Sequence, residues 1–299
     1  MSLFGRSSTS FSNLVIVGII VIAVFYVIKN RNNPDSPIQK IRDIEKKIPQ
    51  KPAPSSGDDT FLPTSTTGEI VHHSYYSLSY SEQDEQAEWV AYELTREMLS
   101  GFRNERKNNF RPDRDVPTGS ATPDDYRGSG YDRGHLCPAS DMSFDETAMD
   151  ETFFMSNMSP QKHYQNCGIW RELEECVKDW AKKYGKIYVV TGPILKGGGF
   201  QKIGRTNKVS VPEAYYKVVM TADAPRKAIG FIVPNEASSE PLNKFSTSID
   251  AVETATDIDF FYNLLSKSDE IRLEANTNLD GWQLNDKRYQ TRVTKWNQN

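Results

Sequence analysis

Residues 166–195 read "NCGIWRELEECVKDWAKKYGKIYVVTGPIL" and place the clearest helix of the chain directly before a clear strand. Apolar side chains recur at spacings of three and four through the first part of this stretch, at Ile169, Trp170, Leu173, Val177, Trp180 and Ala181. This period predicts an amphipathic helix. The run "KIYVVTGPIL" that follows is rich in β-branched and aromatic residues, which predicts a strand.

Strand-like segments surround this pair on both sides. Two of them, "EAYYKVVM" at 213–220 and "KAIGFIVPN" at 227–235, lie downstream, and "EIVHHSYYSLSYS" lies upstream at 69–81. Residues 84–99 carry mixed helix and strand signals, the apolar core of "MDETFFMSNMSPQ" (149–161) suits a strand, and "IDFFYNLLS" (258–266) is expected to form a closing helix. Strands joined mostly by loops around one long helix predict an α+β fold with a mostly antiparallel central sheet flanked by helices.

The N-terminal part differs from this body. After a short segment at 1–10, residues 11–28 read "FSNLVIVGIIVIAVFYVI" without a charge, just long enough for a transmembrane anchor. No small-residue cleavage site follows, so an uncleaved anchor is favoured over a signal peptide, with a buried core helix as the alternative. Residues 29–68 are rich in proline and polar residues and predict a flexible linker. The folded domain is expected at 69–299.

Charge and cysteine content exclude several classes of protein. Of 36 basic and 40 acidic residues, 8 and 5 precede Glu69, which leaves 28 basic and 35 acidic residues in the body. An acidic body argues against nonspecific polyanion binding by bulk charge, so a nucleic-acid site would need a local basic patch. Three irregularly spaced cysteines are too few for a disulfide scaffold, and no CxxC pair indicates structural zinc.

The most specific candidate for chemistry is His135, in the stretch "SGYDRGHLCP" at 129–138. Gly134 gives the histidine little steric cover, and Asp132 or a backbone carbonyl could fix its tautomer. Taken alone, a histidine in a loop is more often structural than functional. Its neighbours along the chain must therefore decide between the two interpretations.

Asn166 and Glu174 supply that context, because both fall on the predicted helix or at its start. Eight residues at 100° each leave the two side chains within about 80° of each other, two turns apart. A neutral carbonyl oxygen and a carboxylate on one side can hold a hard cation such as Mg²⁺. The ordinary alternative is that Asn166 caps the helix and Glu174 lies on a solvated face.

Two basic stretches of the sequence are candidates for binding phosphate. The first, "RNERKNNFRPDR", holds five basic residues, and guanidinium groups bind phosphate in a bidentate manner. Those five are Arg103, Arg106, Lys107, Arg111 and Arg114. The second, "LKGGGFQKIGRTNK" at 195–208, lacks the pattern of a phosphate-binding P-loop and is interpreted as a rim rather than a nucleotide cradle.

These motifs together resemble the DNA/RNA non-specific endonucleases, which include secreted bacterial nucleases and mitochondrial endonuclease G. The chain has "DRGH" at 132–135 preceded by "YRGSGY", then "AMDETFFMSNMSPQ", and then the spacing of Asn166, Trp170, Leu173 and Glu174. The segments "SYSEQDEQAEWVAYEL", "VVTGPIL", "VPEAYYKVV" and "DIDFF" also match, so the resemblance covers about residues 69 to 266. It implies a ββα-metal active-site motif.

The resemblance also implies a role for each matching residue. His135 resembles the general base, Asn166 the one direct protein ligand of Mg²⁺ (or Mn²⁺), and Glu174 a carboxylate that orients the water molecules of the metal. Arg106 resembles the arginine that stabilises charge at phosphorus, Asn157 a supporting polar residue, and Arg133 is expected to help seat the phosphate. His163 is interpreted as a rim residue. Such a site needs no group that reads base edges, which agrees with tolerance of both DNA and RNA.

Two features depart from the simple pattern. Cys137 and Cys167 flank the expected base and metal ligand, and a disulfide between them is a hypothesis if the two segments converge. Residues 267–299 contain no motif that indicates a function.

The leading functional hypothesis is a membrane-anchored, Mg²⁺-dependent, sugar-nonspecific endonuclease that leaves 5′-phosphate ends, as a monomer or a homodimer. The alternatives are a catalytically silent nucleic-acid-binding module on a membrane tether and a phosphodiesterase for small nucleotides. The basic residues that follow the anchor favour a cytoplasmic body. A sequence-blind nuclease would attack the cell's own nucleic acids there, so we expect an extracytoplasmic body, in the periplasm or at the cell surface, with an organellar intermembrane space as the alternative.

Overall fold

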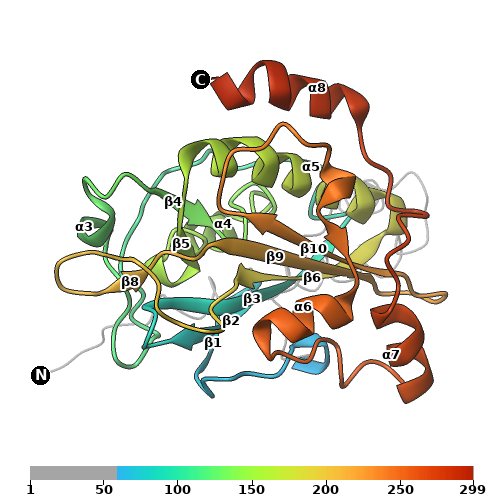
Figure 1. Cartoon of the computed structure of the whole chain (residues 1–299), viewed down its shortest axis with the longest axis horizontal. Helices are drawn as coiled ribbons and strands as arrows, with labels where there is room; N and C mark the ends of the chain where they lie inside the picture. The colour runs from blue at the N-terminus through green and yellow to red at the C-terminus, as the bar shows by residue number, and fades with distance from the viewer. Residues whose placement is uncertain (1–58, 299) are drawn as a thin grey trace, which may run out of the picture. The chain divides into compact units, whose positions relative to one another are not determined.

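The computed structural model describes residues 59–298, and a seven-stranded antiparallel sheet forms their centre (Figure 1). Its strands lie in the order β1-β2-β3-β6-β9-β10-β11. This confirms the predicted α+β class with a mostly antiparallel sheet. The strands are β1 (Ile70–His72), β2 (Ser77–Ser81), β3 (Gln86–Thr95), β6 (Lys186–Pro193), β9 (Ala214–Thr221), β10 (Ala228–Pro234) and β11 (Ser246–Thr247).

Each face of the sheet has its own hydrophobic core, because successive side chains of a strand point to opposite faces. On β9, Tyr215 and Val219 pack in the core beneath helix α5 (Arg171–Tyr184), while Tyr216 and Val218 pack in the other core. Helices α6 (Ile249–Thr256) and α7 (Lys267–Glu274) cover that second face (Figure 1). The sheet is therefore enclosed between helical layers, as the sequence predicted.

Helix α5 forms where its apolar period predicted it. Leu173, Val177 and Trp180 are buried in the core beneath it, and the helix ends at Gly185, whose φ of 84° lies in the region that favours glycine. It begins at Arg171, however, because a π-helical turn occupies Gln165–Trp170. The predicted helix start near Asn166 therefore coincides with the π-helical turn, and the regular α-helix begins five residues later.

Smaller elements surround the sheet and carry the candidate site. Strands β4 (Asp132–His135) and β5 (Met158–Gln161) form a separate antiparallel pair, and β7 (Lys202–Ile203) pairs with β8 (Val209–Ser210) inside the second basic stretch. The remaining helices are α3 (Pro123–Tyr126), α4 (Glu146–Glu151) and α8 (Asp286–Thr294), and short 3-10 turns occupy Asp59–Phe61, Met155–Asn157, Leu242–Lys244 and Trp296–Gln298.

Three sequence-based expectations about elements are wrong. Residues 258–266 form no helix, because α6 ends at Asp257 in a left-handed conformation and Phe260 and Phe261 then insert into the core. The apolar part of 149–161 is not a strand, since α4 and a 3-10 turn precede β5. The body begins before Glu69, because Phe61 and Leu62 are buried in the second core.

The predicted anchor at 11–28 and most of the predicted linker lie outside the described residues. Among residues 59–298, no helix is long and apolar enough to cross a bilayer.

Candidate active site

Strand β4 carries the sequence Asp132–His135 and determines where its side chains point. It pairs with β5 along its whole length. Because side chains alternate along a strand, Arg133 and His135 share one face and Asp132 and Gly134 share the other. Asp132 therefore cannot orient His135 as the sequence suggested, and its carboxylate bonds other residues.

Gly134 is required by a close approach inside this pair of strands. A Cβ atom at this position would lie 2.0 Å from Oε1 and 2.5 Å from Cγ of Gln161. Gln161 is fully buried at the end of β5, so it has no free space into which it can move. The glycine of the motif thus allows the strand of the histidine to pack closely on its partner.

His135 lies between two phenyl rings. The centroid of its ring is 5.8 Å from that of Phe110 and 5.1 Å from that of Phe153, both in T-shaped contact. Burial, reinforced by the positive charges of Arg106 and Arg133, lowers the pKa of His135 to about 3. The imidazole is therefore neutral at neutral pH, which is the form that a general base requires.

The same two rings position the two arginines of the predicted site. The guanidinium carbon of Arg133 lies 4.1 Å from the centroid of Phe110, and that of Arg106 lies 5.1 Å from the centroid of Phe153. Both are cation–π contacts. Arg106 also donates from Nε to Oδ1 of Asn108 at 2.7 Å. Two positive charges thus flank the neutral imidazole.

Asn166 lies in the π-helical turn before α5 rather than on the helix. Its Nδ2 donates to Oδ2 of Asp132 at 2.9 Å, and the same oxygen contacts Nδ1 of His163, also at 2.9 Å. No hydrogen bond within residues 59–298 occupies Oδ1 of Asn166. The aspartate of the "DRGH" motif therefore orients the predicted metal ligand, and the exposed His163 is at the rim, as predicted.

The turn departs from helical geometry at Gly168, whose φ and ψ are −100° and −105°. The angle of about 80° expected between Asn166 and Glu174 assumed one continuous helix, so it does not apply. Glu174 lies in the first turn of α5, and its negative charge acts on Arg106. Burial lowers the pKa of Arg106, and the charge of Glu174 opposes this shift.

Burial raises the pKa of Glu174 to about 8; Lys217 opposes the shift and Asp141 adds to it. Lys217 comes from the centre of β9 and is fully buried, and its Nζ has no hydrogen-bond partner in the described part of the chain. This Nζ lies 4.7 Å from the ring centroid of Trp170. Burial lowers the pKa of Lys217, while the charges of Glu174 and Asp141 act to raise it, so Lys217 is interpreted as the charge partner of these two carboxylates.

Asn157 is a positioning residue and does not reach toward substrate. It is fully buried, its Oδ1 accepts from the backbone N–H of Cys137 at 2.8 Å, and its Nδ2 donates to the carbonyls of Cys137 at 3.0 Å and Thr152 at 2.8 Å. The role that the resemblance implies for Asn157, a supporting polar residue of the site, stays a prediction. Asn157 fixes the chain that leaves β4 just after His135.

Most of the first basic stretch is used in local contacts. Lys107 pairs with Glu146, Arg111 pairs with Asp150 at 2.6 Å, and Arg103 donates to the carbonyl of Ser140. Only Arg106 of this group lies against the rings beside His135. The stretch is therefore a braced loop that presents one arginine, and it is not a continuous phosphate-binding patch.

The three cysteines are free. The hypothesis of a Cys137–Cys167 disulfide is therefore wrong. Cys137 is fully buried in the core beneath α5 and acts as a small apolar residue. Cys167 instead donates from Sγ to the carbonyl of Trp296 at 3.4 Å.

Two of the predicted site residues, Arg133 and Asn166, line a pocket of about 590 Å³, and His135, Arg106, Glu174 and Asn157 are not part of its lining. Arg133, Asp132 and Asn166 line it together with Phe110 and residues 123–131 of the preceding loop. An unoccupied amide oxygen, a guanidinium group and a neutral imidazole next to that arginine are the groups that bind a cation and a phosphate and remove a proton from water.

Comparison with known proteins supports this chemistry. The model of the DNA/RNA non-specific endonuclease family matches residues 54–267, well over half of the chain. The chain belongs to this family. It is therefore a metal-dependent nuclease that acts on DNA and RNA without sequence specificity.

Relatives of this nuclease come from distant organisms. Nuclease C1 of Cunninghamella echinulata is 36% identical over 219 residues, 67% of this chain and 85% of that protein. Human mitochondrial endonuclease G is 34% identical over 211 residues, 66% of this chain and 71% of that protein. A crystal structure of the EndoG/EndoGI complex matches with a TM-score of 0.61 at 32% identity, covering 66% of this chain and 86% of that chain.

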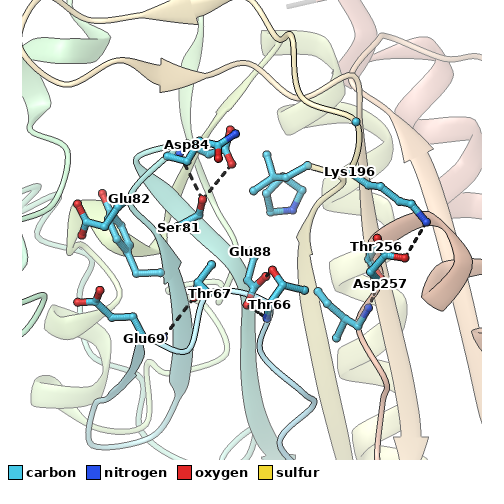
Figure 2. A pocket seen from close by; sticks show the side chains of 16 residues that line it. Thr66, Thr67, Glu69, Ser81, Glu82, Asp84, Glu88, Lys196, Thr256 and Asp257 are labelled. Carbon is cyan, nitrogen blue, oxygen red and sulfur yellow. Dashed lines mark hydrogen bonds and ion pairs between the residues drawn. The ribbon is translucent and has the colours of Figure 1, made fainter.

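A second pocket of the nuclease, of about 480 Å³, has a different character (Figure 2). Its acidic side chains include Glu88, which accepts from Ser79 Oγ at 2.6 Å, and Asp84, which accepts from Ser81 Oγ at 2.9 Å. Lys196 is the one basic residue of its lining. Negative charge repels phosphate, so this pocket is not a second nucleic-acid site.

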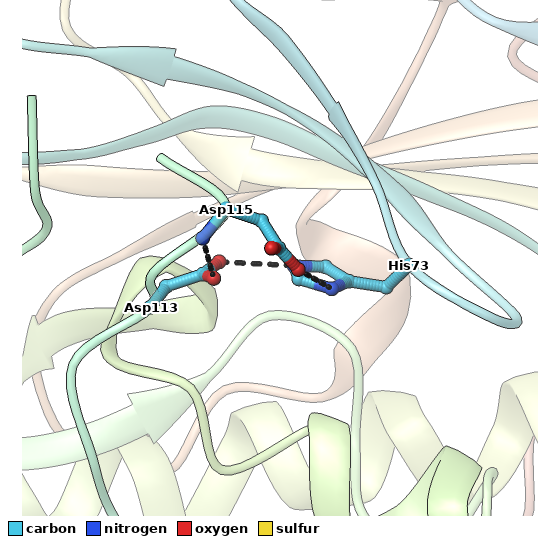
Figure 3. Close-up of side chains that lie close together, drawn as sticks. All are labelled: His73, Asp113 and Asp115. Carbon is cyan, nitrogen blue, oxygen red and sulfur yellow. Dashed lines mark hydrogen bonds and ion pairs between the residues drawn. The ribbon is translucent and has the colours of Figure 1, made fainter. Parts of the chain in front are cut away.

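A buried histidine of the nuclease braces the loop that carries Arg106 (Figure 3). His73 Nε2 contacts Oδ2 of Asp113 at 2.9 Å, and its Nδ1 lies 3.8 Å from Oδ2 of Asp115. Ser156 donates to the same Asp113 oxygen at 2.5 Å. These contacts tie the end of the basic stretch to the β1–β2 connection and to the turn before β5.

The sequence motifs do not point to Phe153 or Lys217 as site residues, and they place Phe110 only within the basic stretch. Phe153 belongs to an apolar run that suits the core of a strand, and Lys217 belongs to a predicted strand. One signal for Lys217 is present in the sequence. The run "AYYKVVM" suits a buried strand apart from this single charged residue, and a charge in such a strand is unusual.

Proposed function

We propose that this nuclease hydrolyses phosphodiester bonds with Mg²⁺, or with Mn²⁺ in its place, and leaves 5′-phosphate ends. His135 acts as general base, Asn166 binds the cation directly, Glu174 orients its water, and Arg106 and Arg133 hold the phosphate. One observation carries the proposal: no group among residues 59–298 bonds Oδ1 of Asn166, which lines a pocket together with Arg133, the arginine on the same strand face as His135.

His135 begins the reaction by accepting a proton from the attacking water. Its Nε2 is buried without a partner among residues 59–298, while the residue as a whole is partly exposed, so we assign Nδ1 as the proton acceptor. The phosphate that enters between the two arginines offsets their charge, which raises the basicity of the imidazole when substrate is present.

The two arginines stabilise the negative charge that develops on the oxygens at phosphorus. Each guanidinium lies on a phenyl ring, and the rings are themselves in T-shaped contact at 5.1 Å, so both charges are preorganised before substrate binds. Preorganised positive charge stabilises a transition state without reorganisation during the reaction. Bond breaking then releases the 3′-oxygen and leaves the phosphate on the 5′ side.

The bound cation would polarise the phosphate and stabilise the leaving oxygen. An amide oxygen and a carboxylate suit a hard cation that keeps most of its waters. Asp132 keeps the Oδ1 of Asn166 available by engaging its Nδ2, and Lys217 favours the ionised form of Glu174.

We also propose that residues 11–28 anchor the nuclease in a membrane with the body on the extracytoplasmic side. The uncharged run and the hazard of a sequence-blind nuclease in the cytoplasm support this placement. Protease treatment of intact cells, of cells in which only the outer barrier is opened, and of fully lysed cells tests it, with a cytoplasmic protein as control. Cleavage of the body only in fully lysed cells, together with the cytoplasmic control, would contradict the orientation.

The catalytic proposal is tested with purified residues 51–299 acting on supercoiled plasmid and on RNA, with Mg²⁺ or EDTA. The wild type is expected to cut both substrates only with the cation and to leave 5′-phosphate ends, which polynucleotide kinase labels only after a phosphatase has removed the phosphate. His135→Ala is expected to lose activity by a factor of about 10³. Equal cleavage by this variant would overturn the role of His135.

A further inference from the structure

The C-terminal segment, residues 285–298, lies beyond the part of the chain that the family model matches. It comprises α8 and the 3-10 turn that follows, and α8 runs along the outer side of α5 (Figure 1). Its end packs on the turn 165–170 that carries Asn166, more than 100 residues away in sequence.

Three contacts join the segment to this turn. Cys167 donates from Sγ to the carbonyl of Trp296 at 3.4 Å. The guanidinium carbon of Arg171 lies 4.3 Å from the ring centroid of Trp296. A Cβ atom on Gly168 would lie 2.5 Å from Oδ1 of Asn297, so that side chain occupies the space next to the irregular peptide.

A buried arginine anchors the segment. Arg292 is completely buried and bonds Glu172, which is also buried in the first turn of α5. Its other nitrogens donate to the carbonyls of Ser238 and Glu240, the second at 2.6 Å. A buried ion pair with all its partners in place holds α8 in one position relative to α5.

The turn cannot hold Asn166 by helical hydrogen bonding alone. Gly168 has non-helical φ and ψ, so the regular i to i−4 pattern is interrupted two residues after the predicted ligand. The position of the turn therefore depends on what packs against it. Ile169 and Trp170 of the turn are buried in the core beneath α5. At the level of Asn166, the backbone N–H donates to the carbonyl of Lys162 at 3.0 Å, Asp132 engages the side chain, and the C-terminal segment packs on Cys167 and Gly168.

We propose that the C-terminal segment is a positioning element for the metal site, with Arg292 as its anchor and Trp296 and Asn297 as its contacts with the turn. It holds Asn166 where its Oδ1 meets the cation, and so it sets the metal affinity of this nuclease. This rests on the proposed role of Asn166 as the direct ligand.

The test compares wild type with Arg292→Met, Trp296→Ala and the control Lys287→Met, in the chain from residue 51. Lys287 is an exposed basic residue of the same helix. Titration calorimetry gives the Kd for Mn²⁺ without nucleic acid, and hydrogen exchange gives the protection of residues 165–171. Arg292→Lys tests rescue of the anchor.

Arg292→Met and Trp296→Ala are expected to weaken Mn²⁺ binding by about tenfold and to speed exchange in the turn, with partial rescue by Arg292→Lys. Lys287→Met should match the wild type. At saturating cation the KM for plasmid should be unchanged. Unchanged Kd and exchange in a folded Trp296→Ala variant would overturn the proposal.

Failure of the proposed function is distinguishable from failure of this inference. If Asn166→Ala binds Mn²⁺ as the wild type does, Asn166 is not the ligand and the proposed metal role fails. The exchange measurement does not use the metal, so it still decides whether the segment holds the turn.

Discussion

His135 and Asn166 belong to one site but are held by opposite kinds of structure. His135 ends a strand whose backbone is paired with β5, and Asn157 fixes the residues just after it. Asn166 lies in an irregular turn that is held by Asp132 on one side and by the C-terminal segment on the other. The base is therefore placed by regular local pairing and the metal ligand by long-range packing. A site of this kind can lose its metal without losing its base.

We call His135 and the strand pair that carries it the strand half of the site, and Asn166 and its turn the turn half. Loss of Asn157 tests the strand half and has the largest expected effect on folding. Asn157→Ala leaves three buried backbone groups without partners. At about 1–3 kcal/mol for each group, the free energy of unfolding should fall by about 4 kcal/mol. Urea denaturation measures it, with the exposed Asn109→Ala as control. A loss below about 1 kcal/mol would show that Asn157 does not lock this half.

A methyl group on Gly168 tests the turn half. Gly168→Ala places a Cβ against Asn297, so the turn must shift while the strand pair is untouched. We expect the Kd for Mn²⁺ to rise by about 30-fold, with a much smaller change in stability than Asn157→Ala causes. Calorimetry at fixed pH measures the Kd. The double variant Gly168→Ala with Asn297→Gly should recover part of the affinity, and no recovery would contradict the packing argument.

The buried lysine links both halves through charge. Lys217 opposes the raised pKa of Glu174, so Lys217→Met should raise that pKa further. Ionised Glu174 is needed to hold the waters of the cation, and the pH at which Mg²⁺ binds should therefore move upward. We expect about tenfold weaker binding at pH 7 and recovery at higher pH. A pH-independent loss would indicate damage to packing instead.

The smallest expected effect is a change in how stability depends on pH. Folded His135 has a pKa of about 3, well below the value of about 6.5 for an unfolded histidine. The unfolded state therefore takes up this proton first as pH falls. Its contribution to stability is complete above pH 6.5 and is lost as pH falls toward 3. His135→Gln should lose about 1 kcal/mol less than wild type between pH 7 and 5.5, and parallel urea curves would contradict the shift.

The same contrast explains what could be predicted from sequence. Helix α5 and the strands of the sheet are local patterns, so the fold class could be predicted from periodicity, while His135 and its arginines were implied by the resemblance of the motifs to a known family. The start of α5, the orientation of Asn166 and the use of Asp132 depend on Gly168 meeting Asn297, which no local pattern records. The helix predicted at 258–266 is wrong for a related reason, because burial of Phe260 and Phe261 in the core outweighs their helical spacing.

The central claim is that the strand half and the turn half form one hydrolytic site, and a double-mutant cycle tests it most directly. Plasmid nicking rates at saturating Mg²⁺ are compared for wild type, His135→Ala, Asn166→Ala and the double variant. Groups that act as a unit give strongly non-additive losses. We predict that the double variant is no slower than the slower single variant. Losses that multiply, or a His135→Ala variant that nicks at the wild-type rate, would contradict this account.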